Sequence, residues 1–166
     1  MATTSEVPVL IVGGGAAGSV LALELARRGI EFRCIDRMPG PAEESRAIAL
    51  HSRTLELLDR VDRKLSKRCL DRGLWHNGYV MHFLREGGRT EVRPGLDFTR
   101  VASRYNCFLS HNQSETEGFI RDHIKSNYGQ EIEYNTRFVN LVQDDDGVTA
   151  TVAHRERAPC RRRSSS

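Results

Sequence analysis

A glycine-rich stretch near the N-terminus constrains the fold of this chain more than any other feature. An apolar run of strand length, residues 7–12, leads directly into Gly13-x-Gly15-x-x-Gly18, and a helical pattern follows at once. In a strand–turn–helix of this kind the first glycine permits a tight turn, the second lets the backbone approach a pyrophosphate, and the third lets the helix pack tightly on the sheet. The pattern predicts a dinucleotide-binding βαβ unit.

The sequence after the glycines supports this prediction. A helix is expected over residues 16–28 with Gly29 at its C-terminal cap, and a second strand over residues 30–35 ends on Asp36. Asp36 lies eighteen positions after Gly18. An acid about twenty residues past the glycines is suited to accept hydrogen bonds from ribose hydroxyls. The two strands should be parallel neighbours, because a βαβ crossover returns alongside its first strand.

Composition limits the classes of function. The chain has 166 residues, 39% of them hydrophobic and 28% charged, which suffices for one domain with a core. The net charge is only +3 and the basic residues are spread along the chain, so no nucleic-acid partner is predicted. No apolar run approaches the roughly 18 residues of a membrane span. Residues 1–6 lack the basic flank and apolar core of a signal peptide, so a cytoplasmic protein is expected.

The cysteines and histidines indicate neither a disulfide framework nor a metal centre. No C-x-x-C pair occurs, and the widely spaced cysteines are predicted to be reduced and structural: Cys34, Cys69, Cys107 and Cys160. The six histidines are scattered, and His76 and His82 have neither the spacing nor the neighbours of a zinc site. No metal is therefore predicted.

A second motif lies after the loop that follows Asp36. Arg46-Ala47 is followed by the segment RTLELL over residues 53–58, whose leucines predict a helix that starts near Ser52. Together with the glycine motif, this stretch resembles a signature of the FAD-dependent aromatic hydroxylases, the flavoprotein monooxygenase family of p-hydroxybenzoate hydroxylase and phenol hydroxylase. In that family the arginine that matches Arg46 lies along the flavin nucleotide, where a guanidinium can hold phosphate oxygens in a planar fork.

A further signal precedes a predicted helix in the second half of the chain. Ser114-x-x-Glu117 fits a capping box, and the helix is expected to run to about Asn127 with Gly129 beyond its end. Gln113 stands just before this cap. By resemblance to the hydroxylases it matches a glutamine that reaches the flavin, and an amide can both donate to and accept from a bound cofactor.

Two hairpins are predicted from turn chemistry. Residues 78–84 and 89–92 are expected to pair through a Gly-Gly turn, and 137–142 should pair with 148–152 through an acidic turn that ends in Asp-Gly. Part of 131–142 should lie in or beside the parallel sheet. The acidic turn lacks the alternating ligands of a calcium loop, so its turn chemistry explains it.

The resemblance also implies a domain organisation. Residues 1–75 and 105–154 correspond to an incomplete FAD-binding domain, 76–104 to the start of a β insertion that covers the substrate, and 155–166 to a disordered basic tail. The predicted fold is therefore an α/β, Rossmann-like FAD-binding βαβ domain with a parallel sheet, truncated, plus the start of a substrate-domain β-sheet. Because the resemblance stops near residue 153, ahead of a later Gly-Asp motif that contacts the flavin in the family, the chain alone is expected to be inactive.

The resemblance implies FAD as cofactor, NAD(P)H as a transient reductant, and hydroxylation of a small aromatic substrate. The predicted cofactor-binding residues are Gly13, Gly15, Ala16, Ala17, Gly18, Asp36, Arg37, Arg46 and Gln113. No catalytic acid, base or nucleophile is predicted. Two alternatives stay open. An NAD-dependent dehydrogenase shares the glycines and Asp36 but has no reason to carry Arg46 or Gln113, and the basic tail suggests a truncated, non-catalytic fragment.

Overall fold

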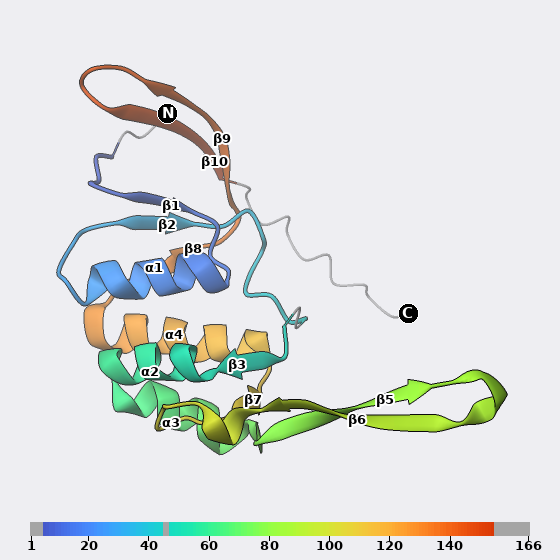
Figure 1. The fold of residues 1–166 in the computed structure, drawn as a ribbon. Helices are drawn as coiled ribbons and strands as arrows, with labels where there is room; N and C mark the ends of the chain where they lie inside the picture. The colour runs from blue at the N-terminus through green and yellow to red at the C-terminus, as the bar shows by residue number, and fades with distance from the viewer. Residues whose placement is uncertain (1–4, 45–46, 155–166) are drawn as a thin grey trace, which may run out of the picture.

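The computed structural model describes residues 5–44 and 47–154, which form four α-helices and ten β-strands (Figure 1). The predicted basic tail at 155–166 and Arg46 lie outside the described residues. The helices are α1 (Ala16–Ala26), α2 (Ser52–Val61), α3 (Arg63–Arg72) and α4 (Gln113–Tyr128). The strands are β1 (Leu10–Val12), β2 (Arg33–Ile35), β3 (Ala49–His51), β4 (Leu74–His76), β5 (Gly78–Leu84), β6 (Thr90–Asp97), β7 (Phe108–Ser110), β8 (Ile132–Glu133), β9 (Thr136–Gln143) and β10 (Val148–His154).

The N-terminal unit is a strand–helix–strand in which the two strands, β1 and β2, are parallel neighbours. β1 pairs in parallel with β2, with Ile11 opposite Cys34, and β2 pairs in parallel with β8 in the order β1-β2-β8. The predicted βαβ unit and its parallel sheet are thereby confirmed. Both strands are shorter than predicted. Ahead of β2, the N–H of Ile30 donates to the Leu25 carbonyl of α1 at 3.1 Å. Residue 30 is therefore still bonded to the end of the helix, and the strand begins only at Arg33.

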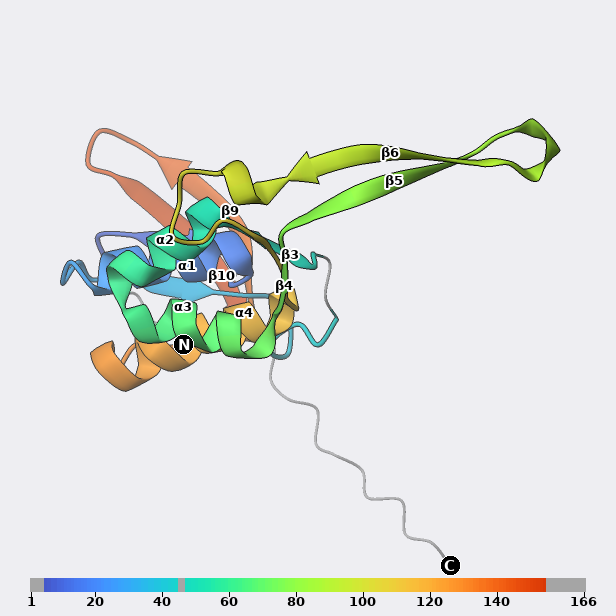
Figure 2. The same ribbon diagram turned by 60° about the horizontal axis from the view of Figure 1, so that its bottom comes forward.

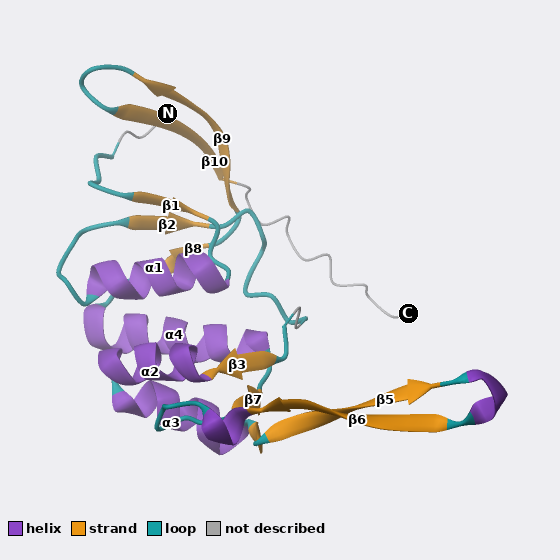
Figure 3. Cartoon of the chain, in the orientation of Figure 1, coloured by secondary structure: helices purple, strands orange, loops and turns teal. Residues whose placement is uncertain are grey.

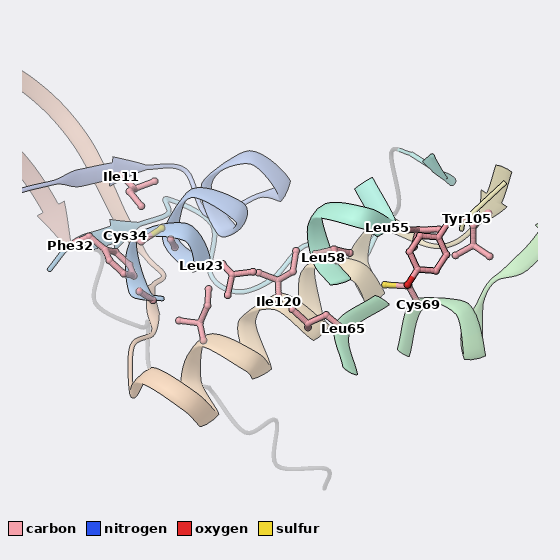
Figure 4. Packing of buried hydrophobic residues seen from close by; sticks show 14 of the residues in the cluster. Ile11, Leu23, Phe32, Cys34, Leu55, Leu58, Leu65, Cys69, Tyr105 and Ile120 are labelled. Carbon is pink, nitrogen blue, oxygen red and sulfur yellow. The ribbon is translucent and has the colours of Figure 1, made fainter. Parts of the chain in front are cut away.

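The helices form a layer on one side of this sheet (Figure 3), with α1 and α4 packed on each other and α2 on α3. Figure 4 shows the buried side chains running from the sheet through the helices, with Leu23 of α1 next to Ile120 of α4. Charges alternate in sign over residues 59–72, as on a helix face open to water. α3 instead buries Leu65 and Cys69, because one stripe of this charged segment is apolar at helical spacing.

A second sheet, in the order β3-β7-β4, is antiparallel and lies at the far end of the helical layer. From it the β5–β6 hairpin projects as an arm away from the rest of the molecule (Figures 1 and 2). The predicted hairpin is confirmed, and β6 is longer than expected. Gly87 and Gly88 both have positive φ, at 77° and 74°, and close the turn.

The β9–β10 hairpin is confirmed as well. Val148 pairs with Gln143, and Gly147, with φ 146°, ends the acidic turn. The Asp144 carboxylate accepts hydrogen bonds from the backbone N–H groups of Asp146 and Gly147, both at 3.0 Å. Only two residues separate the end of β8 from the start of β9, so the parallel sheet continues directly into this hairpin.

Candidate dinucleotide-binding site

The glycine loop between β1 and α1 takes a shape that side chains would obstruct. Gly13 has φ +106°, a conformation that L-residues rarely adopt. A Cβ on Gly18 would lie 1.8 Å from the Gly13 carbonyl oxygen and 3.4 Å from Cγ2 of Ile11, so the helix can approach the loop and strand only with glycine here. A Cβ on Gly15 would meet no atom within 4 Å. The loop is therefore open at Gly15, where a ligand can approach the backbone.

The N-terminus of α1 opens beside this loop. Ser19 is the first residue whose N–H bonds within the helix, to the Gly15 carbonyl at 2.8 Å. The preceding N–H groups, those of Ala16, Ala17 and Gly18, have no carbonyl in the helix to bond, as in any helix. No acidic residue lies in the first turn, and Gly15 has no side chain that could cap it. The positive end of the helix dipole is thus suited to bind an anion such as a pyrophosphate.

Asp36 is fixed next to the loop by its backbone and its side chain. Its N–H donates to the Glu133 carbonyl at 2.8 Å, and its carbonyl accepts from Thr136 at 2.9 Å, so it is anchored between β2, β8 and β9. Its Oδ2 accepts from the Gly14 N–H at 2.7 Å, and its Oδ1 from the Met38 N–H at 2.8 Å. The carboxylate is held at the end of β2, where a ribose next to a loop-bound pyrophosphate would lie.

Most of the predicted site residues meet in one cleft of about 580 Å³. Its lining residues are Val12, Gly13, Gly15, Ile35, Asp36, Arg37, Met38, Ala42, Glu44, Gln113, Glu117, Thr136, Arg137 and Phe138. Ala16, Ala17 and Gly18 form the first turn of α1 next to it. The cleft lies at the carboxyl ends of parallel strands β1 and β2, the usual ligand position in an open α/β sheet.

Gln113 lies inside α4 and not, as was predicted, before its cap. Asn112, not Ser114, is the N-cap residue of α4, so Gln113 is the first helical residue and the capping box is wrong. Its Nε2 donates to Oε1 of Glu117 at 2.7 Å. The Glu117 side chain therefore binds the Gln113 amide instead of a backbone N–H at the helix start.

Nine of the lining residues were not among the predicted site residues. Four of them come from α4 and the start of β9: Glu117, Thr136, Arg137 and Phe138. Two signals could have identified them. Glu117 follows Gln113 at the i, i+4 spacing that places two side chains on one helical face. The β9 residues follow β8 directly, and β8 was expected in the parallel sheet whose carboxyl ends form the site.

Burial raises the pKa values of two groups near the parallel sheet. Burial raises the pKa of the Cys34 thiol on β2 to about 11, with the Asp36 charge adding to this effect, so the thiol stays neutral at pH 7. Burial likewise raises the pKa of Tyr134. Cys34, Cys69 and Cys107 are free thiols, in line with the prediction of reduced cysteines. Within residues 5–44 and 47–154, no three His, Cys, Asp or Glu side chains are grouped so that they could hold a metal ion.

A strand–glycine loop–helix with an acid at the end of the second strand defines this chain as a dinucleotide-binding α/β protein. The particular family follows from sequence comparison. The model of the FAD-binding domain family matches residues 6–162, so the chain belongs to that family. This match resolves the choice between a flavin-binding domain and an NAD-dependent dehydrogenase in favour of the first. No helix in the part of the chain that the structure describes is both long and apolar enough to cross a membrane.

Curated relatives are monooxygenases by name. The chain is 33% identical over 147 residues to pentachlorophenol 4-monooxygenase of Sphingobium chlorophenolicum, covering 89% of this chain and 26% of that protein. It is 31% identical over 153 residues to rifampicin monooxygenase of Streptomyces venezuelae, covering 92% of this chain and 30% of the relative. The chain thus spans only between a quarter and a third of the length of these relatives and corresponds to the N-terminal FAD-binding part of the aromatic hydroxylase family.

Solved structures share the fold. The flavin-dependent monooxygenase PieE, solved in complex with FAD and substrate, superposes with a TM-score of 0.76 at 28% identity, over 88% of this chain and 26% of that one. The p-nitrophenol 4-monooxygenase of Pseudomonas putida gives a TM-score of 0.73 at 25% identity, over 88% of this chain and 36% of that one. The α/β fold class predicted from the glycine motif is confirmed by these structures and by the β1-β2-β8 sheet.

Proposed function

We propose that the cleft binds FAD and that the chain acts as the nucleotide-binding part of an NAD(P)H- and O2-dependent monooxygenase of small aromatic molecules. One observation supports this most directly. The open glycine loop, the Asp36 carboxylate and the Gln113 amide, which are far apart in sequence, line one cleft. The donor set also fits the ligand, because N–H groups suit the pyrophosphate and a carboxylate suits ribose hydroxyls.

Each part of the cleft has a separate role in this proposal. The N–H groups of the first turn of α1 bind the pyrophosphate, Asp36 accepts from the adenosine ribose, and Gln113 contacts the flavin half. Arg37 and Arg137 supply positive charge along the cleft. Arg46 is proposed to lie along the nucleotide, as the matching arginine does in the hydroxylases. The bound flavin supplies the redox and oxygen chemistry, and this chain binds and orients it.

The substrate class is proposed from the relatives, whose names include a chlorinated phenol and the aromatic antibiotic rifampicin. Residues 76–104 are proposed to begin the part of the protein that covers such a substrate. No residue of this chain is proposed as a catalytic acid, base or nucleophile. Turnover is proposed for a protein of the relatives' length, and this chain alone is expected to act as a non-catalytic fragment. A cytoplasmic location is part of the same proposal.

The proposal is tested by calorimetric titration of the 166-residue chain with FAD and with ADP, beside the variant Gly15→Ala. A Cβ at Gly15 meets no protein atom within 4 Å, so this variant should keep the wild-type melting temperature. The same methyl group would lie where a pyrophosphate must approach, so binding of both ligands should weaken at least roughly tenfold, about 1.4 kcal/mol. Wild-type protein that binds neither ligand, or a Gly15→Ala variant that binds both as tightly as wild type, would overturn the proposal.

A further inference from the structure

A buried carboxylate lies behind the Gln113 amide. Glu117 is one helical turn further along α4 and is only 3% exposed. Its Oε1 accepts the hydrogen bond from Gln113 Nε2 at 2.7 Å, and its Oε2 lies 3.6 Å from Nη1 of Arg121. The three residues follow one another at i, i+4 spacing and so share one face of α4. Gln113 and Glu117 line the cleft, whereas Arg121 does not.

Packing alone does not account for Glu117 at this position. Burying a carboxylate costs free energy that an apolar side chain of similar size does not, and an ion pair offsets that cost only in part. Ile120 and Ile124, about one and two turns further along the buried side of α4, show that apolar residues are compatible with this face. The carboxylate therefore points to a specific polar contact, and the contact present is the Gln113 amide.

A carboxylate can control which end of an amide faces a ligand. A glutamine amide can turn by 180° about its last bond and exchange its donor and acceptor ends. An ionised carboxylate only accepts hydrogen bonds, so Glu117 favours the orientation in which Nε2 of Gln113 faces it. The amide oxygen of Gln113 then lies on the opposite side of the amide group from Glu117.

We infer that Glu117, with Arg121 as its counter-ion, is a positioning residue that fixes the orientation of the Gln113 amide for the flavin half of the cofactor. The amide oxygen accepts a hydrogen bond from a hydroxyl of the ribityl chain, a group that FAD carries and ADP lacks. This inference rests on the proposed function, since it assumes that the cleft binds FAD. It assigns to Glu117 a role that acts through Gln113 and not by contact with the ligand.

The test is a double-mutant cycle on FAD affinity with Gln113→Ala, Glu117→Gln and the double variant. Glu117→Gln should weaken FAD binding about 3- to 10-fold, the effect of one hydrogen bond. In the Gln113→Ala background the same change should have less than about a twofold effect, because the group that Glu117 orients is gone. ADP affinity should stay unchanged in all three variants. Glu115→Gln is the matched control, since Glu115 lies in the same helix and pairs with Arg72 outside the cleft.

The outcomes separate the inference from the proposed function. Wild-type protein that binds neither FAD nor ADP overturns the proposed function and this inference with it. Wild-type binding of both ligands, with additive effects of the two substitutions or with an equal loss of ADP affinity, overturns the inference alone.

If Glu117→Gln does not fold, the cycle is run with Arg121→Gln, whose side chain is 20% exposed, and the same coupling is expected. In the ligand-free chain, Glu117→Gln but not Glu115→Gln should also shift the NMR signal of the Gln113 side-chain amide.

Discussion

Both carboxylate oxygens of Asp36 are hydrogen-bonded within the chain itself, one to Gly14 and one to Met38. These bonds fix the orientation of the side chain, so nucleotide binding does not have to order it. A carboxylate oxygen has more than one lone pair and can still accept from a ribose hydroxyl. The same residue thereby supports the loop and presents an acceptor to the cleft.

At the residue scale, we predict that Asp36→Ala lowers FAD affinity by about 1.5–3 kcal/mol, because a hydrogen bond to a charged group is lost. Isothermal titration measures this change. Asp145→Ala is the control, since Asp145 is an exposed acid at the tip of the β9–β10 hairpin, away from the cleft. An FAD dissociation constant that Asp36→Ala leaves unchanged would remove Asp36 from the site.

At the scale of elements, the close approach of α1 to the glycine loop gives a stability prediction. Gly18→Ala would place a methyl group 1.8 Å from the Gly13 carbonyl oxygen, a backbone atom that cannot swing aside. The variant should lose about 3 kcal/mol of unfolding free energy, the upper end of the usual cost of overpacking. Urea denaturation monitored by circular dichroism measures the change.

Gly118→Ala in α4 is the matched control for this prediction. A Cβ there would meet only Nη2 of Arg121, at an ordinary distance of 3.7 Å. The same substitution should therefore raise the unfolding free energy by about 0.5–1 kcal/mol, since alanine favours a helix interior over glycine. If the two variants shift the urea midpoint in the same direction, the steric explanation of Gly18 is wrong.

The elements around the glycine loop were predictable because their signals are local. Strand, glycine spacing and helix follow one another within about twenty residues. The start of α4 was not predictable in the same way, since Asn112 and Ser114 are both good N-cap residues. Hydrogen bonds to a distant segment decide between them. His111 donates its N–H to Ile48 at 2.9 Å, and Gln113 donates to Ala47 at 3.2 Å, which fixes where the helix begins.

The candidate site shows the same division between local and distant information. Gly13, Gly15 and Asp36 belong to one βαβ unit, so their shared cleft follows from the motif. Arg137 lies in that cleft because β8 pairs with β2, from which it is separated by about one hundred residues of chain. β9, which carries Arg137, follows β8 after a short turn. Sequence pattern identifies β9 as a strand but does not give its partner. Gln113 was identified by resemblance, and its contact with Glu117 became visible only in the folded chain.

At the scale of the whole molecule, the β5–β6 arm stands apart from the body that contains the cleft (Figure 2). Its apolar side chains are largely exposed, with Val80 at 59%, Leu84 at 80% and Leu96 at 57%. None of the residues that line the cleft belongs to the arm. A two-stranded hairpin with little support from the body adds little to its stability, which agrees with the proposal that 76–104 begin a separate insertion.

The arm is therefore expected to be removable. Gly78 and Asp97 are direct partners across the base of the hairpin, so residues 79–96 can be replaced by Asn-Gly, a favoured two-residue turn. Asp97 then keeps its hydrogen bond to the Thr99 N–H at 3.0 Å, and Phe98 keeps its bond to the Asn77 carbonyl at 2.8 Å. The shortened chain should unfold cooperatively and bind ADP within about twofold of wild type, because the parallel sheet and its helices carry both properties.

The shortened chain should also elute as a monomer more completely in size-exclusion chromatography, since the exposed apolar surface of the arm is gone. Gly15→Ala in the full chain provides the contrast, as it should lose ADP binding while the arm is intact. A shortened chain that melts without cooperativity, or that no longer binds ADP, would show that the arm is part of the nucleotide-binding domain.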